Sequence, residues 1–170
     1  MAFVRKLLTT QSRVRVLGIC FGHQIIGRAM SCPVIRNEIG WETSVLPVTL
    51  TAVGSRLFEG LKELRIMQMH RDIVSAYPST LEDERGVKHE IERLGATKEC
   101  EVQGMYVKGR FMGVQGHPEF TEGIVREILT SRWTKGIFDD AEYEEAMKRV
   151  GNKQDGVIVA KAMLRFLLDD

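Results

Sequence analysis

One cysteine between two glycines constrains the fold of this chain more than any other feature. It lies at Cys20 in the segment 18–24, which reads GICFGHQ. Residues 13–19 are rich in β-branched side chains and predict a short strand, whereas 22–30 carry apolar side chains at helical spacing. The small residues Gly18 and Gly22 would permit a strained turn from strand to helix. Cys20 would then lie at a helix N-terminus, where free N–H groups favour the reactive thiolate. The segment therefore predicts a nucleophilic cysteine on a strand–turn–helix elbow.

A candidate base follows a second apolar strand, predicted over 110–114. The next residues include the sequence GHPE at 116–119, so His117 and Glu119 are two positions apart. Pro118 would fix the local backbone, and Glu119 could hold the imidazole in one tautomer and orientation, as the third member of a nucleophilic triad does. Either motif alone arises often by chance. Because each follows a predicted strand, together they predict a triad of Cys20, His117 and Glu119.

These two motifs resemble the hallmarks of the class I glutamine amidotransferase-like hydrolases, Gly-x-Cys-x-Gly-His-Gln and a later Gly-His-Pro-Glu. Three further segments, at 40–42, 69–72 and 102–106, look like the stand-alone branch of that family, which includes γ-glutamyl peptidases and fungal proteins. The resemblance covers residues 14–120. It implies an α/β fold, with a flavodoxin-like mixed sheet flanked by helices.

The resemblance also implies roles for particular residues. The Cys20 thiolate would attack a γ-glutamyl amide to form a thioester, with His117 as the proton donor and base and Glu119 ionised. The backbone N–H of Phe21 would be one oxyanion donor. Gln24 matches the motif glutamine that family members use near the substrate, and His70 matches a segment that often lies at the substrate's amino-acid end.

Each of these residues also has a purely structural interpretation. Cys20 could be a small buried apolar side chain, and His117 a hydrogen-bonded histidine of the core. His70 could serve the fold rather than the substrate. Cys32 and Cys100 lack the elbow context and are expected in the core. His23 is expected to position the turn, and His89 to be solvated.

The chain departs from the resemblance before Cys20. Family domains begin with one or two further strand–helix units and a glycine-rich loop that gives a second oxyanion donor, but no glycine precedes Gly18. Residues 1–11 instead predict an amphipathic helix that leads into the nucleophile strand. We therefore expect a domain truncated at its N-terminus that lacks the first strand–helix units, with an open edge on the nucleophile strand. Losing one oxyanion donor typically costs about 10²- to 10³-fold in rate.

Composition limits the classes of function. With 170 residues, of which 44% are hydrophobic, we expect a single domain over 1–170, with its core in 12–136 and C-terminal helices in 137–168. A formal net charge of +1 gives no basic stripe for nucleic acid or a membrane surface. No apolar run approaches the roughly 18 residues of a membrane span. Three cysteines without a secretory signal predict a reducing compartment, hence a cytoplasmic protein.

The remaining patterns predict elements around these motifs. Strands are expected at 43–51, 64–70, 91–97, 100–107 and 110–115, the last two joined by a hairpin turn at Lys108 and Gly109. A polar surface loop is expected at 78–88. Asp139 and Asp155 are expected as N-caps of C-terminal helices. Three such helices are predicted from their apolar positions, which are Ile124, Ile128, Leu129 and Trp133; Tyr143, Ala146, Met147 and Val150; and Val157, Ala160, Leu164 and Leu167.

Three hypotheses about function follow. The favoured one is a cysteine amidohydrolase acting on glutamine or a γ-glutamyl peptide. The second is a glutaminase subunit that supplies ammonia to a separate synthase partner. The third is a catalytically impaired homologue with a binding or regulatory role. Paired metal-ligand spacings and glycine-rich phosphate loops are missing, so no metal and no cofactor are expected.

Overall fold

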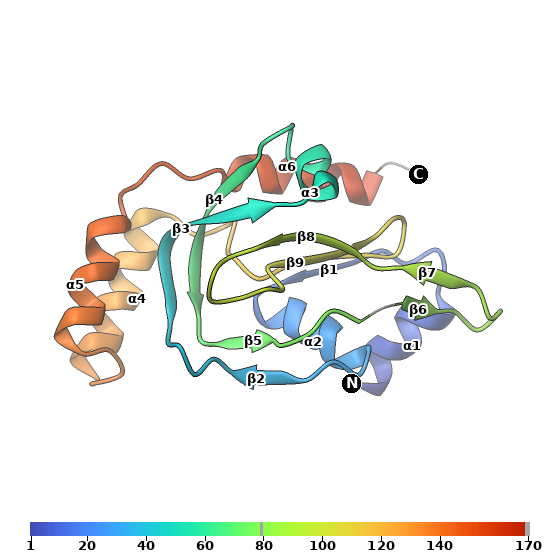
Figure 1. Cartoon of the computed structure of the whole chain (residues 1–170), viewed down its shortest axis with the longest axis horizontal. Coiled ribbons are helices and arrows are strands. Elements are labelled where there is room, and N and C mark those ends of the chain that lie inside the picture. The colour runs from blue at the N-terminus through green and yellow to red at the C-terminus, as the bar shows by residue number, and fades with distance from the viewer. Residues whose placement is uncertain (79, 169–170) are drawn as a thin grey trace.

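The computed structural model describes residues 1–78 and 80–168 (Figure 1). Its helices are α1 (Ala2–Thr10), α2 (Phe21–Ala29), α3 (Ala52–Leu57), α4 (Glu122–Thr134), α5 (Asp140–Arg149) and α6 (Gly156–Leu168). Its strands are β1 (Val16–Ile19), β2 (Val34–Arg36), β3 (Glu42–Leu50), β4 (Glu63–His70), β5 (Asp72–Val74), β6 (Thr80–Glu82), β7 (Lys88–Glu90), β8 (Glu92–Ala96), β9 (Gly104–Val107) and β10 (Phe111–Val114).

The centre of the fold is a six-stranded sheet in the order β1-β10-β9-β8-β3-β4. β1 pairs with β10 in parallel, and the other neighbours pair antiparallel. The predicted mixed sheet flanked by helices is therefore confirmed. Within the described residues β1 lies at one edge of this sheet, as expected for the nucleophile strand.

Helices cover both faces of the sheet. On one face, α1 and α2 place Leu8 and Ile26 in an apolar cluster with Met105 and Phe111. On the other face, α6 contributes Phe166 to a second cluster that includes Met112, Val48 and Val159. Figure 1 shows these two layers, and places α4 and α5 together beyond one end of the sheet. A third cluster, which includes Val125, Leu129 and Ala146, joins that pair of helices to β3 and β4.

The predicted hairpin is confirmed. Phe111 of β10 pairs with Val107 of β9, and Gly109 in the turn has φ +68°, a conformation that favours glycine. Strands also form in the predicted segments 43–51, 64–70 and 91–97. The strand predicted over 100–107 begins only at Gly104.

Four short strands and one helix were not predicted. β2 pairs with β5, β6 pairs with β7, and α3 follows β3. The prediction of a polar loop over 78–88 was wrong, because 80–82 and 88–90 form a hairpin. At its turn the Asp83 carboxylate accepts the N–H groups of Arg85 and Val87, each at 3.0 Å. These strands have three residues each, too few to show an alternating pattern.

The three C-terminal helices form as predicted, but the buried face of α6 was predicted wrongly. Val157 and Leu164, expected inside, are 70% and 58% exposed. The buried side chains are Val159, Ala162, Met163 and Phe166. Because α6 is apolar on most sides, the spacing of its apolar residues did not define one face.

The predicted caps differ in how they act. Asp139 caps α5 in a reciprocal capping box with Glu142. Asp155 precedes α6, but its carboxylate accepts the backbone N–H of Arg65 at 2.9 Å. Asp155 therefore ties the start of α6 to β4.

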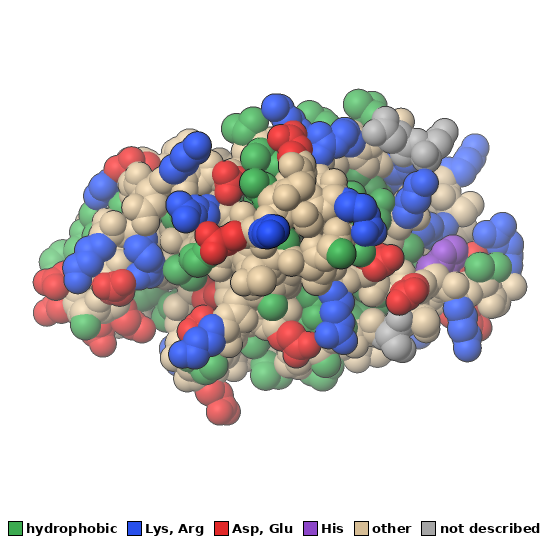
Figure 2. All heavy atoms as spheres, turned by 45° about the horizontal axis from the view of Figure 1, so that its top comes forward, with side chains coloured by type: hydrophobic (Ala, Val, Ile, Leu, Met, Phe, Trp, Pro, Cys, Tyr) green, Lys and Arg blue, Asp and Glu red, His purple; other side chains and the backbone are tan. Residues whose placement is uncertain are grey.

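The surface carries mixed charge. Figure 2 shows Lys and Arg side chains interspersed with Asp and Glu on the face it presents. Among the described residues, no helix is long and apolar enough to cross a bilayer.

Candidate active site

Cys20 lies in a strained turn between β1 and α2. It is the N-cap of α2 and has φ +48° and ψ −100°, a positive φ that is unusual for a residue with a side chain. Its backbone N–H donates to the carbonyl of Val114 at 2.9 Å, and its carbonyl accepts the N–H of Gln24 at 3.1 Å. Both ends of the turn are thus held by regular elements. The predicted strand–turn–helix elbow is present.

The two glycines of the elbow have different surroundings. A Cβ on Gly18 would lie 2.6 Å from the carbonyl carbon of Gly22 and 2.7 Å from the Ile26 side chain, so α2 packs directly on this part of β1. A Cβ on Gly22 would meet no atom within 4 Å. Close packing therefore leaves no room for a side chain at Gly18. The strained backbone conformation is adopted by Cys20, not by either glycine.

The Cys20 thiol is partly buried, and this burial changes its pKa. Burial raises its pKa above the ordinary value, an effect larger than the lowering by the Phe21 N–H. The nearby charges of Glu119 and Arg132 raise and lower it further, respectively. The Phe21 N–H at the helix N-terminus acts in the expected direction, but burial outweighs it.

His117 and Glu119 are in contact. Nδ1 of His117 lies 2.7 Å from Oε1 of Glu119, and the ring stacks on Phe120 with centroids 3.9 Å apart. The His117 N–H donates to the carbonyl of Met67 at 2.8 Å, which fixes this loop to β4. The imidazole is thus held in one orientation by a carboxylate, a ring and a backbone bond.

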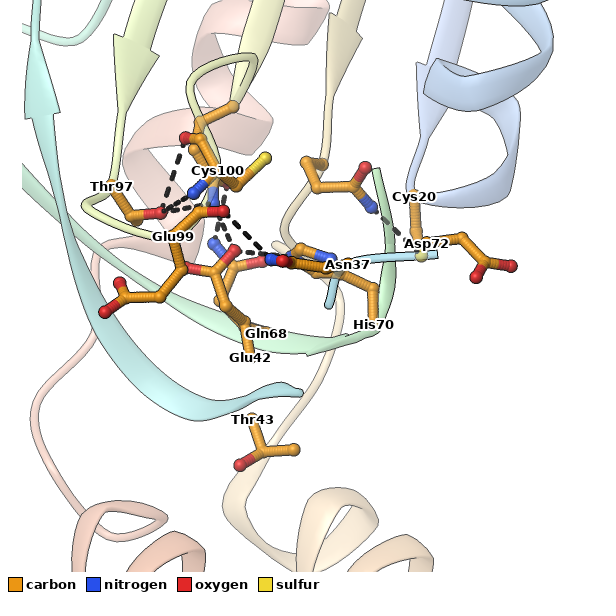
Figure 3. Close-up of polar contacts among 12 residues, drawn as sticks. Cys20, Asn37, Glu42, Thr43, Gln68, His70, Asp72, Thr97, Glu99 and Cys100 are labelled. Carbon is orange, nitrogen blue, oxygen red and sulfur yellow. Dashed lines mark hydrogen bonds and ion pairs between the residues drawn. The ribbon is translucent and has the colours of Figure 1, made fainter. Parts of the chain in front are cut away.

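Strand pairing brings Cys20 and His117 to the same end of the sheet. Ile19 of β1 is opposite Val114 of the parallel strand β10, and the two candidate residues follow these strand ends. The described residues include no hydrogen bond between Cys20 and His117. The Cys20 sulfur instead accepts the Gln115 amide at 3.6 Å (Figure 3). Catalytic hydrogen bonds are often long in the absence of substrate.

A pocket of about 170 Å³ opens beside Cys20. Its walls include Gln24, Trp41, His70, Arg71 and Asp72. A larger hollow of about 440 Å³ lies elsewhere, lined by Arg56, His89 and Lys108 among others, and contains no cysteine. We take the pocket beside Cys20 as the candidate site because it includes the expected nucleophile.

Gln24 and His70 both line the pocket, but their polar groups also serve the fold. The Gln24 amide donates to the carbonyl of Asp72 at 2.8 Å and thereby ties α2 to β5. Nε2 of His70 lies 3.1 Å from the Glu42 carboxylate, and both side chains are almost fully buried. Nε2 of His70 therefore faces a buried carboxylate, although the side chain also lines the pocket.

Behind the pocket lies a buried polar cluster that sequence reasoning missed. The Gln103 amide donates to Glu42 at 2.8 Å, and the Gln68 amide donates to Gln103 at 3.0 Å. Figure 3 shows Glu42, Gln68 and His70 gathered together. Glu42 and Gln103 lie in two of the segments that resemble the stand-alone branch of the family. That resemblance marked the segments in the sequence but indicated no role for either residue.

The other histidines and cysteines are structural. His23 is fully buried, its Nε2 lies 3.1 Å from the carbonyl of Val102, and burial lowers its pKa to about 4. His89, expected to be solvated, is partly exposed and also lies 3.4 Å from the Asp83 carboxylate. Cys32 and Cys100 are buried, as expected. Within residues 1–78 and 80–168, no group of His, Cys, Asp and Glu side chains could hold a metal ion.

Comparisons with known proteins agree on one family. The family model described as glutamine amidotransferase class-I matches residues 1–132. A glutamine amidotransferase-like protein of Schizosaccharomyces pombe is 34% identical over 168 residues, 99% of this chain and 63% of the relative. Gamma-glutamyl peptidase 4 of Arabidopsis thaliana is 32% identical over 68% of this chain and 44% of its own length. A glutamine-hydrolyzing GMP synthase of Clostridium acetobutylicum is 32% identical over 83% of this chain and 28% of its length.

A solved structure supports the same fold. A glutamine amidotransferase from Thermotoga maritima superposes with a TM-score of 0.69 at 19% identity, covering 99% of this chain and 68% of that one. At this identity the likeness concerns the fold alone. The chain spans less than two thirds of the length of the S. pombe relative.

Proposed function

This chain belongs to the class I glutamine amidotransferase family, and we propose that it is a cysteine amidohydrolase that cleaves a γ-glutamyl amide through a thioester on Cys20. One observation carries the proposal. The strained Cys20 elbow and the His117–Glu119 pair follow the neighbouring parallel strands β1 and β10, at the same end of the sheet. Nucleophile, base and orienting carboxylate are the three parts that covalent amide hydrolysis requires.

The proposed reaction has two steps. His117 takes the proton of the Cys20 thiol as the sulfur attacks the γ-carbonyl carbon. The oxyanion then collapses as the carbon–nitrogen bond breaks and His117 gives this proton to the leaving amine. Water then attacks the thioester and gives one proton to His117, which passes it to the Cys20 sulfur as the carbon–sulfur bond breaks. The γ-carboxyl product leaves and the Cys20 thiol is regenerated. Glu119 holds Nδ1 of His117, which leaves Nε2 for proton transfer. The Phe21 N–H is the proposed oxyanion donor.

We propose a γ-glutamyl peptide as the substrate in preference to free glutamine. The similarity to a gamma-glutamyl peptidase of A. thaliana supports this choice. The similarity to a glutamine-hydrolyzing GMP synthase supports the alternative of a glutaminase subunit for a separate synthase. Release of an amino acid from γ-glutamyl peptides would favour the peptide substrate. Release of ammonia from glutamine, stimulated by a co-purifying protein, would favour the glutaminase subunit.

The test is covalent capture of an electrophilic glutamine analogue, followed by mass spectrometry. We expect one adduct on Cys20 in the wild type, none in Cys20→Ala, and slower labelling in His117→Ala. The matched control is Cys32→Ala, which removes a buried cysteine of the core and should label normally. A folded wild type that captures no analogue would contradict the proposal and favour a binding or regulatory role.

A further inference from the structure

Arg132 places a cation against Trp41, one of the side chains that line the pocket beside Cys20. It lies in the last turn of α4, and its guanidinium carbon is 4.8 Å from the centroid of the Trp41 ring and 5.9 Å from that of Phe138. Trp41 itself lines the pocket beside Cys20. Stacking on an aromatic face orients the guanidinium plane and leaves its edge N–H groups available.

Those N–H groups are not fully used. Nη1 of Arg132 is buried, and it has no hydrogen-bond partner among the described residues. Arg126, on the same helix, is by contrast paired with Glu122 at 2.8 Å. A buried donor without a partner is unfavourable, so an acceptor from a ligand would relieve it.

The surrounding charge favours an anion. Arg36 and Arg71 also line the pocket, and Asp72 is the one carboxylate among its lining residues. The charges of Arg132 and Cys20 influence each other: each stabilises the charged form of the other, against burial that disfavours both. This mutual influence agrees with the stacking on Trp41, which places the guanidinium next to one wall of the pocket that holds Cys20.

We propose that Arg132 binds a carboxylate of the substrate. The inference rests on the proposed function, because γ-glutamyl compounds carry an α-carboxylate and a peptide leaving group adds a second one. Guanidinium groups bind carboxylates through two parallel N–H bonds, a geometry that lysine cannot reproduce. Both sources of carboxylate present the same chemistry to Arg132, and the experiments below distinguish them.

The first experiment needs no turnover. The rate of Cys20 alkylation is measured with iodoacetate, which carries a carboxylate, and with iodoacetamide, which does not. The ratio of the two rates cancels changes in thiol ionisation. We expect Arg132→Met to lower this ratio about 10-fold, the scale of a charge-assisted hydrogen bond, and Arg132→Lys to lower it less.

The matched control is Arg126→Met, on the same helix but paired with Glu122. Its ratio should equal that of the wild type. An unchanged ratio in both folded Arg132 variants would overturn the proposal. If Arg132→Met fails to fold, the alkylation ratio of Arg132→Lys alone tests the proposal. Lysine keeps the positive charge but cannot form the two parallel N–H bonds of a guanidinium.

The second experiment separates the two carboxylates. Michaelis constants are compared for γ-glutamylglycine and for γ-glutamyl methylamide, whose leaving group has no carboxylate. An increase of about 10- to 100-fold in KM for both substrates in Arg132→Met would assign the α-carboxylate, and an increase for γ-glutamylglycine alone would assign the leaving group. Unchanged KM values with an active wild type would overturn the proposal.

The two proposals can fail separately. If the wild type cleaves neither substrate but its alkylation ratio still depends on Arg132, the amidohydrolase proposal fails and the carboxylate site stands. If the wild type cleaves both substrates and neither readout depends on Arg132, the carboxylate-site proposal fails and the amidohydrolase proposal stands.

Discussion

Burial shifts the pKa values of two side chains of the elbow in opposite directions. It raises the pKa of the Cys20 thiol and lowers that of the His23 imidazole to about 4. Both shifts favour the neutral form, because the interior solvates charge poorly. The elbow is therefore neutral at rest, and a charged nucleophile has to be produced by its partners or by pH.

The raised thiol pKa predicts how the reactivity of Cys20 depends on pH. Only the thiolate reacts with iodoacetamide, so the rate should still be rising at pH 9.0, the ordinary midpoint of a cysteine. The measurement is the alkylation rate of Cys20 by mass spectrometry from neutral to alkaline pH. A rate that reaches its plateau below that midpoint would mean that proton transfer to His117, rather than burial, controls the thiol.

His23 predicts a loss of stability in mild acid. The unfolded chain binds a proton near pH 6.5 and the folded chain only near 4, so stability is complete above this window and falls as pH decreases through it. We expect this residue to cost about 2 kcal/mol of unfolding free energy between pH 7 and pH 5. Urea unfolding at both pH values measures it.

The matched variant is His23→Gln, whose amide can still donate to the Val102 carbonyl but cannot titrate. Its stability should change less between the two pH values than that of the wild type. An equal loss in both proteins would assign the pH dependence to other groups.

Single residues were predictable where the chemistry is local. Cys20 is recognisable from its flanking glycines, and the contact of His117 with Glu119 spans two positions of one motif. The pairing of Gln103 with Glu42 joins residues 61 positions apart, which only the sheet brings together. Arg132 was missed for the same reason, because its stacking on Trp41 depends on how α4 packs against β3.

At the scale of elements, the elbow depends on the close packing of α2 against β1. We predict that Gly18→Ala destabilises the protein by about 1–3 kcal/mol, because the added Cβ would lie 2.6 Å from the Gly22 backbone. The same change at Gly22 meets open space and should stabilise α2 by about 0.5–1 kcal/mol. Urea unfolding measures both, and equal effects would contradict the packing described.

Elements were predictable where side chains differ between two faces. β3 and β4 are long strands, and the hairpin between β9 and β10 carries a glycine turn, so these were found. α6 was recognised as a helix, but Val157 and Leu164 are as apolar as the buried Val159 and Phe166. Only the position of α6 on the sheet decides which of them is inside.

At the scale of the whole molecule, three apolar clusters meet at one sheet. Phe111 and Met112 are adjacent in β10, yet they belong to the clusters on opposite faces. β3 joins the second cluster through Val48 and the third through Val45. Shared strands of this kind couple the layers, so we expect the chain to unfold as one cooperative domain.

The tryptophans allow this cooperativity to be tested far from the mutation. Trp41 packs against the third cluster, and Trp133 stacks on Tyr143 of α5 with centroids 4.7 Å apart. Phe111 lies in the first cluster and is fully buried. Tryptophan fluorescence therefore reports on α4 and α5, and circular dichroism on all helices together.

We predict that Phe111→Ala costs about 3–5 kcal/mol and lowers the urea midpoint equally by both signals. The loss reaches the distant tryptophans only if the three clusters unfold together. Phe3→Ala is the matched control, because that ring is 73% exposed on α1 and its removal should change neither midpoint appreciably. A fluorescence midpoint that stays at the wild-type value while the circular dichroism midpoint falls would mean that α4 and α5 form a separately stable unit.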